Sequence, residues 1–133
     1  MNKGIQQNEV EIRVRYAECD AMGVLHHAKY LEYFEVARTD LLRHNGFRYR
    51  DLEEQGIFFV VAKFECRYRR PIRYDDVVTV RTRVTRTTRT RVEHAYEILR
   101  DGIVCCEAAS TLACVGRDGR PTLMPEKLWP VEP

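Results

Sequence analysis

Residues 15–38 read RYAECDAMGVLHHAKYLEYFEVAR. Apolar side chains in this stretch and just beyond it recur at helical spacing, and they predict a helix from about residue 27 to about residue 45. The segment from Asp20 to Gly23 predicts a turn between a preceding strand and this helix. Because backbone N–H groups at a helix start are unpaired and carry partial positive charge, this junction can bind a developing oxyanion. A carboxylate beside such donors suits acyl-transfer or hydrolytic chemistry.

The rest of the chain predicts strands. Alternation of apolar and polar residues over 9–16 is typical of a half-buried strand. After the long helix, a short second helix over 47–55 precedes four more strands, which we expect over 57–70, 78–84, 92–98 and 103–115. An apolar helix face and a run of antiparallel strands can bury each other only if the sheet wraps the helix. The element order therefore predicts an α+β fold with an antiparallel sheet around one long central helix.

Length and composition limit the classes of protein to consider. A chain of 133 residues fits one domain, 1–133, and we expect residues 1–8 and 125–133 to lie loosely at its ends. The formal net charge of +2 is too small to indicate a nucleic-acid partner by itself. Five cysteines without a CxxC pair fit neither a disulfide framework nor a zinc site, and free thiols favour the cytoplasm. We identify no secretory signal and no apolar run near the roughly 18 residues of a transmembrane segment.

The same stretch resembles the signature of the hotdog-fold acyl-CoA thioesterases. The resemblance is to the 4-hydroxybenzoyl-CoA thioesterase-like branch, which includes the thioesterase linked with the Tol-Pal envelope system, and it extends from about residue 9 to about residue 128. The matching residues are Tyr16, Asp20, Gly23, Val24, His27, Tyr30, Phe34, Glu35, Ala37 and Arg38. Cys19, His26 and Lys29 depart from the residues common in that branch, which leaves the acyl-group preference open.

This resemblance implies a function and an assembly. It implies an antiparallel sheet wrapped around a central helix, and an enzyme that hydrolyses acyl-CoA to a free acid and coenzyme A. It implies a homodimer or homotetramer with the active site at the seam between chains. It implies no metal and no redox cofactor, because coenzyme A arrives as part of the substrate. Whether the acyl donor is coenzyme A or an acyl-carrier protein stays open.

Asp20 and His27 are the candidate catalytic residues. An Asp before a helix is commonly a cap or turn former, whereas the resemblance makes Asp20 the catalytic carboxylate. It can attack the thioester carbonyl or deprotonate water, and the sequence does not choose between these routes. His27 can offer its backbone N–H to the thioester oxygen, or its ring to water or the leaving thiol. Glu18 can raise the pKa of Asp20 or be solvated, and we expect the solvated state, the norm for carboxylates.

Other residues near this junction have a structural and a functional interpretation. The resemblance places Tyr16, Gly23 and Val24 among the substrate-binding residues, although Tyr16 can also simply pack in the core. Cys19 invites a nucleophilic-thiol hypothesis, but we expect it to behave as a small hydrophobe because no Cys–His–acid arrangement accompanies it. Adjacent histidines lack metal-ligand spacing, so no metal site is expected. Glu35 and Arg38 lie three residues apart on the helix and can pair.

An arginine-rich hairpin is the other distinctive feature. Five arginines alternate with threonines over residues 81–91. They can form a solvated charged face, a phosphate site, or a nucleic-acid surface; the last is disfavoured because no recognised binding module is present. The thioesterase resemblance makes Arg86, Arg89 and Arg91 candidates for the phosphates of coenzyme A.

Two hypotheses from other classes remain beside the thioesterase. One is a non-catalytic module that binds acyl-CoA or acyl-carrier thioesters on the same fold. The other is an interaction protein that uses the basic hairpin on an acidic partner, with binding that weakens steeply with salt. A hotdog dehydratase is a lesser alternative, since no second signature supports it.

Overall fold

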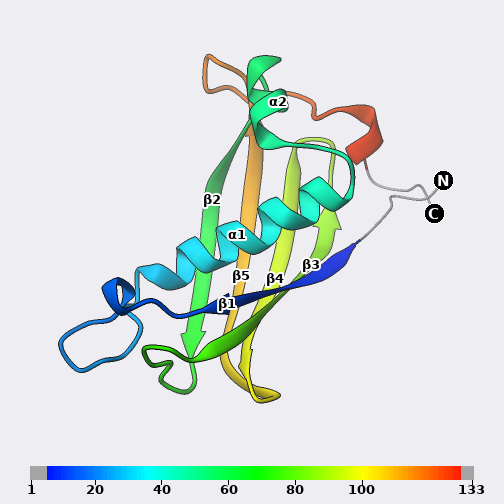
Figure 1. The fold of residues 1–133 in the computed structure, drawn as a ribbon. Helices are drawn as coiled ribbons and strands as arrows, with labels where there is room; N and C mark the ends of the chain where they lie inside the picture. Colours follow the sequence, from blue (N-terminus) through cyan, green and yellow to red (C-terminus); the bar gives the residue numbers. More distant parts are fainter. Residues whose placement is uncertain (1–5, 130–133) are drawn as a thin grey trace.

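The computed structural model of the protein describes residues 6–129 and shows one antiparallel sheet wrapped around one long helix (Figure 1). The sheet has five strands in the order β1-β3-β4-β5-β2. The strands are β1 (Gln7–Arg13), β2 (Phe58–Tyr68), β3 (Val77–Thr87), β4 (Arg91–Arg100) and β5 (Ile103–Val115). The helices are α1 (Lys29–His44) and α2 (Tyr49–Glu54), with short 3₁₀ helices η1 (Tyr16–Glu18) and η2 (Glu126–Leu128). The predicted hotdog architecture is confirmed.

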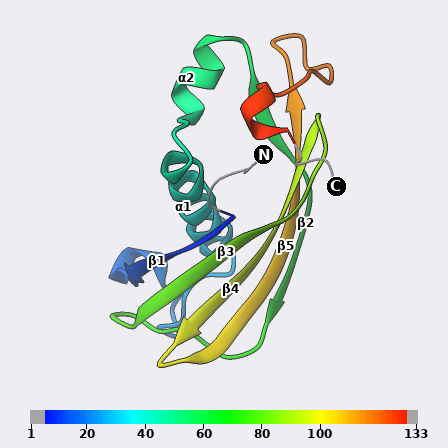
Figure 2. The ribbon, with the colours of Figure 1, turned by 90° about the vertical axis from the view of Figure 1, so that its right-hand side faces the viewer.

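Strands β3, β4 and β5 form a meander, and β1 and β2 lie at the two edges of the sheet. Asp101 and Gly102 form the two-residue turn between β4 and β5, with φ of +52° and +76°. Two successive positive φ values are typical of the turn whose twist matches that of the flanking strands. In Figure 2 both helices lie on one side of the curved sheet, so α1 is enclosed by its concave face.

The core forms between α1 and this concave face. The apolar face of α1 consists of Tyr30, Tyr33, Phe34, Ala37 and Leu41, all buried. The Phe34 ring lies 4.6 Å from the ring of Tyr96 on β4, centroid to centroid. Burying a side chain of this size stabilises the fold by roughly 1.5–3 kcal/mol, so the face of α1 supplies much of the stability.

The structure corrects some predicted boundaries. The helix begins at Lys29, not at about residue 27, because the Lys29 N–H donates to the His26 carbonyl in a separate turn. The first strand ends at Arg13, since the chain then turns into η1. Leu31, one of the apolar residues at helical spacing that predicted the helix, is 44% exposed, because Tyr30 takes the buried position beside it.

The ends of the chain are more ordered than predicted where they are described. The sheet begins at Gln7, which pairs with Arg83, so residues 7 and 8 are not loose. At the other end, residues 126–128 form η2, and the Trp129 indole N–H donates to the Met124 carbonyl at 2.7 Å. Residues 1–5 and 130–133 of the predicted loose ends lie outside the described part of the chain. Within residues 6–129, no helix combines the length and apolarity that crossing a membrane requires.

Candidate active site

Residues 19–25, here called the Asp20 loop, form a narrow hairpin before α1. Cys19 pairs with Leu25, and the Asp20 N–H donates to the Val24 carbonyl at 2.9 Å. Gly23 has a φ of +79°, a left-handed conformation that side-chain-bearing residues adopt rarely, and it closes the turn. The predicted turn at Asp20 to Gly23 is therefore present, with the strand-like pairing continued on both sides of it.

The Asp20 carboxylate has one restrained and one open oxygen. Its Oδ1 accepts the backbone N–H groups of Met22 at 2.9 Å and Val24 at 3.3 Å. Among the described residues, Oδ2 has no hydrogen-bond partner, and the residue is exposed. The turn-forming use of Asp20 therefore occupies one oxygen and leaves the other available for chemistry.

The connection between β2 and β3 holds the Asp20 loop from one side. The Leu25 N–H donates to the Ile72 carbonyl at 2.7 Å, and the Tyr74 N–H to the Gly23 carbonyl at 3.3 Å. Arg100 fixes this connection in turn, because its Nη1 donates to the Pro71 carbonyl at 2.7 Å and to Asp76 Oδ2 at 3.1 Å. These contacts join residues far apart in sequence, so sequence analysis missed them.

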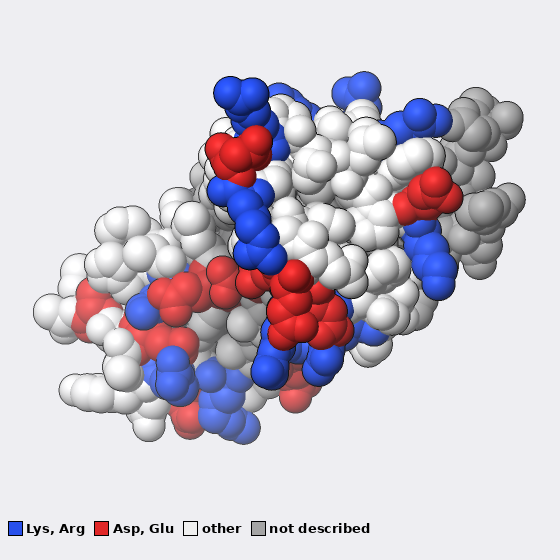
Figure 3. Space-filling view, turned by 90° about the horizontal axis from the view of Figure 1, so that it is seen from above, with Lys and Arg blue, Asp and Glu red and all other residues white. Residues whose placement is uncertain are grey.

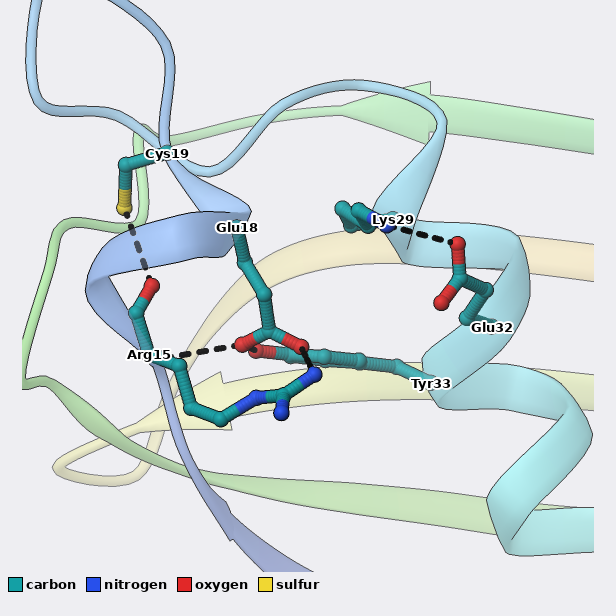
Figure 4. Close-up of polar contacts among 6 residues, drawn as sticks. All are labelled: Arg15, Glu18, Cys19, Lys29, Glu32 and Tyr33. Carbon is teal, nitrogen blue, oxygen red and sulfur yellow. Dashed lines mark hydrogen bonds and ion pairs between the residues drawn. The ribbon is translucent and has the colours of Figure 1, made fainter.

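A buried carboxylate holds the loop from the other side (Figure 4). Glu18 is only 6% exposed, and its Oε1 accepts the Arg15 N–H at 2.8 Å and the Tyr33 hydroxyl at 2.7 Å. Burial acts to raise the pKa of Glu18, but hydrogen bonds from Arg15 and Tyr33 outweigh it and hold the pKa below its usual value. The expectation of a solvated Glu18 is wrong, because the η1 turn points this side chain inward at α1.

The two histidines lie in the turn that leads into α1. The His26 Nδ1 accepts the Ala28 N–H at 3.2 Å, and the two imidazole rings stack with centroids 4.3 Å apart. The Tyr68 hydroxyl donates to the His27 carbonyl at 3.3 Å and so ties this turn to β2. In the part of the chain that the structure describes, the His27 N–H donates to no protein group. That free N–H, two residues before α1 begins, is the candidate oxyanion donor.

The predicted substrate-binding residues of this region lie at the surface of the loop. Tyr16 is 79% exposed, so it does not pack in the core, and its ring meets that of Tyr74 edge-on at 5.5 Å. Gly23 and Val24 form the tip of the loop beside Asp20. Met22, which sequence analysis did not single out, is 83% exposed at the same tip. The Met22 and Val24 residues adjoin the carboxylate through their backbone N–H groups, whereas Tyr16 lies on η1, before the loop.

Cys19 lies beside Asp20, and its surroundings do not favour a nucleophilic role. Its Sγ lies 3.7 Å from the Arg15 carbonyl oxygen, a weak hydrogen bond. Burial, helped by the charges of Asp20 and Glu18, raises the pKa of the thiol, which keeps it protonated at neutral pH. Over residues 6–129 no group of three His, Cys, Asp or Glu side chains is placed to hold a metal ion.

Comparison with known proteins identifies the family. The model of the thioesterase-like superfamily matches residues 14–129. The chain belongs to this superfamily. It is 34% identical over 105 residues to the acyl-CoA thioester hydrolase YbgC of Escherichia coli O157:H7, and the match covers 78% of each chain. It is 35% identical over 105 residues to the acyl-CoA thioesterase YbgC of Haemophilus influenzae, covering 78% of this chain and 77% of that one.

Solved structures agree with this membership of the thioesterase-like superfamily. The DHNA-CoA thioesterase of Staphylococcus aureus matches with a TM-score of 0.85 and 37% identity, covering 88% of this chain and 80% of that one. A probable thioesterase of Bartonella henselae has a TM-score of 0.85 at 32% identity over 90% of this chain and 99% of that one. The family predicted from residues 16–38 is confirmed.

Within one chain of this superfamily member, the hairpin arginines do not join the Asp20 loop. Arg13 at the end of β1 pairs with Val77 at the start of β3, whereas the hairpin follows Thr87 at the other end of that 11-residue strand. At roughly 3.3 Å per residue, β3 separates the two regions by on the order of 30 Å. The Arg86 Nη1 lies 3.9 Å from Glu93 Oε2, and the Arg89 Cζ lies 4.4 Å from the centroid of the Trp129 ring. A single site that contains both Asp20 and these arginines therefore needs a second chain.

Proposed function

We propose that Asp20 is the catalytic carboxylate of an acyl-CoA thioesterase. The observation that carries this proposal is the different hydrogen bonding of the two carboxylate oxygens. Two backbone N–H groups donate to Oδ1, whereas Oδ2 has no hydrogen-bond partner among the described residues. The chain hydrolyses acyl-CoA, and the names of its relatives in Escherichia coli and Haemophilus influenzae, an acyl-CoA thioester hydrolase and an acyl-CoA thioesterase, support this activity. Water adds across the acyl–sulfur bond, which breaks to give a free carboxylic acid and the thiol of coenzyme A.

The free N–H of His27 supplies the electrostatic part of this mechanism. As Oδ2 or a water that it deprotonates attacks the thioester carbon, negative charge develops on the carbonyl oxygen. The His27 N–H lies two residues before α1, in a turn that Tyr68 and the Ala28–His26 bond hold, so it can meet such charge with little reorganisation. The His26 Nδ1 accepts the Ala28 N–H, so the His26 ring stabilises the turn that leads into α1. No metal or redox cofactor takes part in this proposal.

We infer a homodimer, or a homotetramer built from it, formed by pairing of two β2 edges. β2 is an edge strand of 11 residues, and Val60 and Val61 on it are 46% and 51% exposed. Long apolar edge strands are templates for pairing with another chain. The other edge, β1, is polar and is bonded to α1, because the Asn8 amide donates to Asp40 Oδ2 at 2.8 Å.

Antiparallel pairing of two β2 strands would also complete the site. The Tyr68 end of β2 lies beside the Asp20 turn, whereas its Phe58 end pairs with Val115, next to the arginine hairpin. A two-fold axis therefore sets the Asp20 end of one chain against the hairpin end of its partner. In this arrangement the partner contributes Arg86, Arg89 and Arg91 to the phosphates of coenzyme A. The five free thiols of the chain are consistent with the cytoplasm as the compartment of this assembly.

The test is release of free thiol from a panel of acyl-CoA thioesters. We expect Asp20→Asn to keep the fold, because the amide oxygen can still accept the two N–H groups, and to lose roughly 10²–10⁴-fold in kcat. Asp118→Asn is the matched control, since Asp118 Oδ1 accepts the Arg120 N–H at 3.0 Å in a similar turn elsewhere. Near wild-type turnover by Asp20→Asn would remove Asp20 from the mechanism. Binding of every ester without turnover by the wild type would indicate a non-catalytic module.

A further inference from the structure

A cavity of about 70 Å³ lies at the other end of α1 from the Asp20 loop. It is bounded by the second half of α1, by α2, by η2 and by the hairpin end of the sheet. Its apolar wall includes Leu41, Leu42, Phe59, Val84, Val92 and Leu112. A small apolar group is therefore accommodated here, away from the catalytic carboxylate of the same chain.

The charges that line this cavity are of one sign. Arg38 and Lys127 line it, and no carboxylate does so among the described residues. The expected Glu35–Arg38 ion pair is not formed: no carboxylate oxygen in residues 6–129 comes within the 4.0 Å of an ion pair with Arg38. Glu35 and Glu53 line only an adjoining outer cavity, which shares Arg38 with the inner one. The inner cavity thus presents a guanidinium that forms no ion pair with any carboxylate of the described residues.

A buried imidazole and a phenol accompany that guanidinium. His94 lines the cavity, is 6% exposed, and its Nδ1 has no hydrogen-bond partner among the described residues. Burial, helped by the Arg38 charge, lowers the pKa of His94 to about 4, so the ring is neutral at pH 7 and can donate one hydrogen bond. Tyr49 lines the same cavity, and its hydroxyl interacts with Arg38. A buried polar atom without a partner is costly, which points to a ligand group that completes it.

We propose that this cavity binds an organic monocarboxylate with a short apolar chain. The carboxylate accepts hydrogen bonds from the Arg38 guanidinium and the His94 imidazole, and the chain packs against Leu41 and Leu112. An engineered apolar cavity of about 150 Å³ binds benzene, and this cavity of about 70 Å³ is roughly half that size, so we expect acids with a chain of a few carbons to fit better than aromatic acids. Such an acid can be the product of this enzyme or come from another reaction. Its binding does not depend on Asp20, and only its identity as product rests on the proposed function.

Direct binding of a carboxylate series tests this proposal without turnover. Acetate, propionate, butyrate, hexanoate and benzoate are titrated into the full-length protein, and binding is followed by NMR of the histidine rings and by calorimetry. Propanamide and butyramide are the neutral probes of matched shape. We expect propionate or butyrate to bind best, the amides to bind at least roughly tenfold more weakly, and the His94 ring signals to shift on binding.

Variants separate the guanidinium from the cavity itself. We expect Arg38→Met to weaken butyrate binding at least roughly tenfold, while Arg43→Met, exposed on the last turn of the same helix, leaves it unchanged. Leu42→Phe keeps every charge but fills the cavity, and we expect it to abolish butyrate binding. This variant tests the proposal independently if Arg38→Met fails to fold. Asp20→Asn should bind butyrate as the wild type does. Equal binding of acid and amide, or butyrate binding unaffected by Leu42→Phe, would overturn the proposal.

Kinetics then identify the source of the acid. If the enzyme's own short-chain product binds the cavity, product inhibition is lost in Leu42→Phe while initial turnover persists. If only acids that the enzyme does not release bind there, the cavity serves an acid made by another reaction. Either result keeps the carboxylate site, and neither depends on the mechanism at Asp20.

Discussion

The Glu18 carboxylate and the Tyr33 hydroxyl lie 2.7 Å apart, and this buried hydrogen bond joins the turn before the Asp20 loop to the middle of α1 (Figure 4). The same carboxylate oxygen accepts the Arg15 N–H, so one side chain sets the position of the η1 turn against the helix. The position of the Asp20 loop therefore depends on a buried polar contact between the η1 turn and α1.

Removing the charge of Glu18 tests this support. We expect Glu18→Gln to lower the free energy of unfolding by about 1.5–3 kcal/mol, the range for hydrogen bonds to charged groups, and to lower kcat because the loop loses its anchor. Chemical denaturation and thiol release measure the two effects. Glu32→Gln is the control, since Glu32 makes only an exposed ion pair with Lys29 at 3.1 Å. Equal stability of the two variants would contradict an anchoring role for Glu18.

His94 predicts a pH dependence of stability. Its pKa falls from 6.5 to about 4 on folding, so the unfolded chain binds a proton more readily between these values. Stability from this group is fully present above pH 6.5 and is lost as the pH falls toward 4, by up to about 3 kcal/mol. Denaturation of the wild type and of His94→Gln between pH 7.5 and pH 4 measures the difference in slope. The exposed His44, replaced by Gln, should leave the slope unchanged; an unchanged slope in His94→Gln would refute the assignment.

The hairpin arginines predict a dependence on the nucleotide of the substrate. We expect Arg86→Ala and Arg91→Ala each to raise KM for acyl-CoA roughly tenfold or more with little change in kcat, because a hydrogen bond to a charged group is worth about 1.5–3 kcal/mol and about 1.4 kcal/mol is a factor of ten. Acyl-pantetheine, which lacks the nucleotide phosphates, should show no such change. Arg81→Ala is the control, since Arg81 lies on β3 like Arg86 but its Nε is 2.7 Å from Glu9 Oε2 on the neighbouring strand β1. A KM effect of equal size on both substrates would argue against phosphate binding.

The β2 edge predicts the oligomeric state. We expect Val61→Asp to shift the protein toward monomer, because a charge in the middle of the paired edges would be buried without a partner. Size-exclusion chromatography with light scattering measures the mass, and thiol release should fall in parallel if each site is built from two chains. Leu123→Asp is the control, an exposed apolar residue outside the sheet. A dimer that persists in Val61→Asp would place the interface elsewhere.

Positive and negative side chains are mixed on the surface of the protein that Figure 3 shows. Viewed from above, basic and acidic side chains are interspersed, and no continuous basic field covers that face (Figure 3). Several charges of the protein are paired, such as the Arg48 Nε, which lies 2.9 Å from Asp51 Oδ2 in α2. That face therefore offers no general positive potential, and the proposed phosphate contacts depend on individual arginines.

The periodic spacing of apolar residues made the fold predictable from the sequence. The long-range contacts around the Asp20 loop could not be predicted from that spacing. The strands and α1 were predicted because alternation and helical spacing record which faces are buried. Glu18 was misjudged because alternation says nothing of a 3₁₀ turn that reverses a side chain toward Tyr33, 15 residues away. The Arg100–Asp76 contact, which fixes the connection that holds the Asp20 loop, spans 24 residues and has no local signature.

The sequence by itself determined the hotdog order of elements, the superfamily, and Asp20 at a turn before a helix, because these depend on residue type and spacing along the chain. Only the tertiary structure decided that the hairpin arginines lie at the other end of β3. It also decided that, within residues 6–129, one oxygen of Asp20 has no hydrogen-bond partner and no carboxylate lines the cavity that Arg38 faces. The reason is physical: which groups share a surface depends on how the sheet curves around α1, and that curvature brings together residues whose separation in sequence carries no record of their contact.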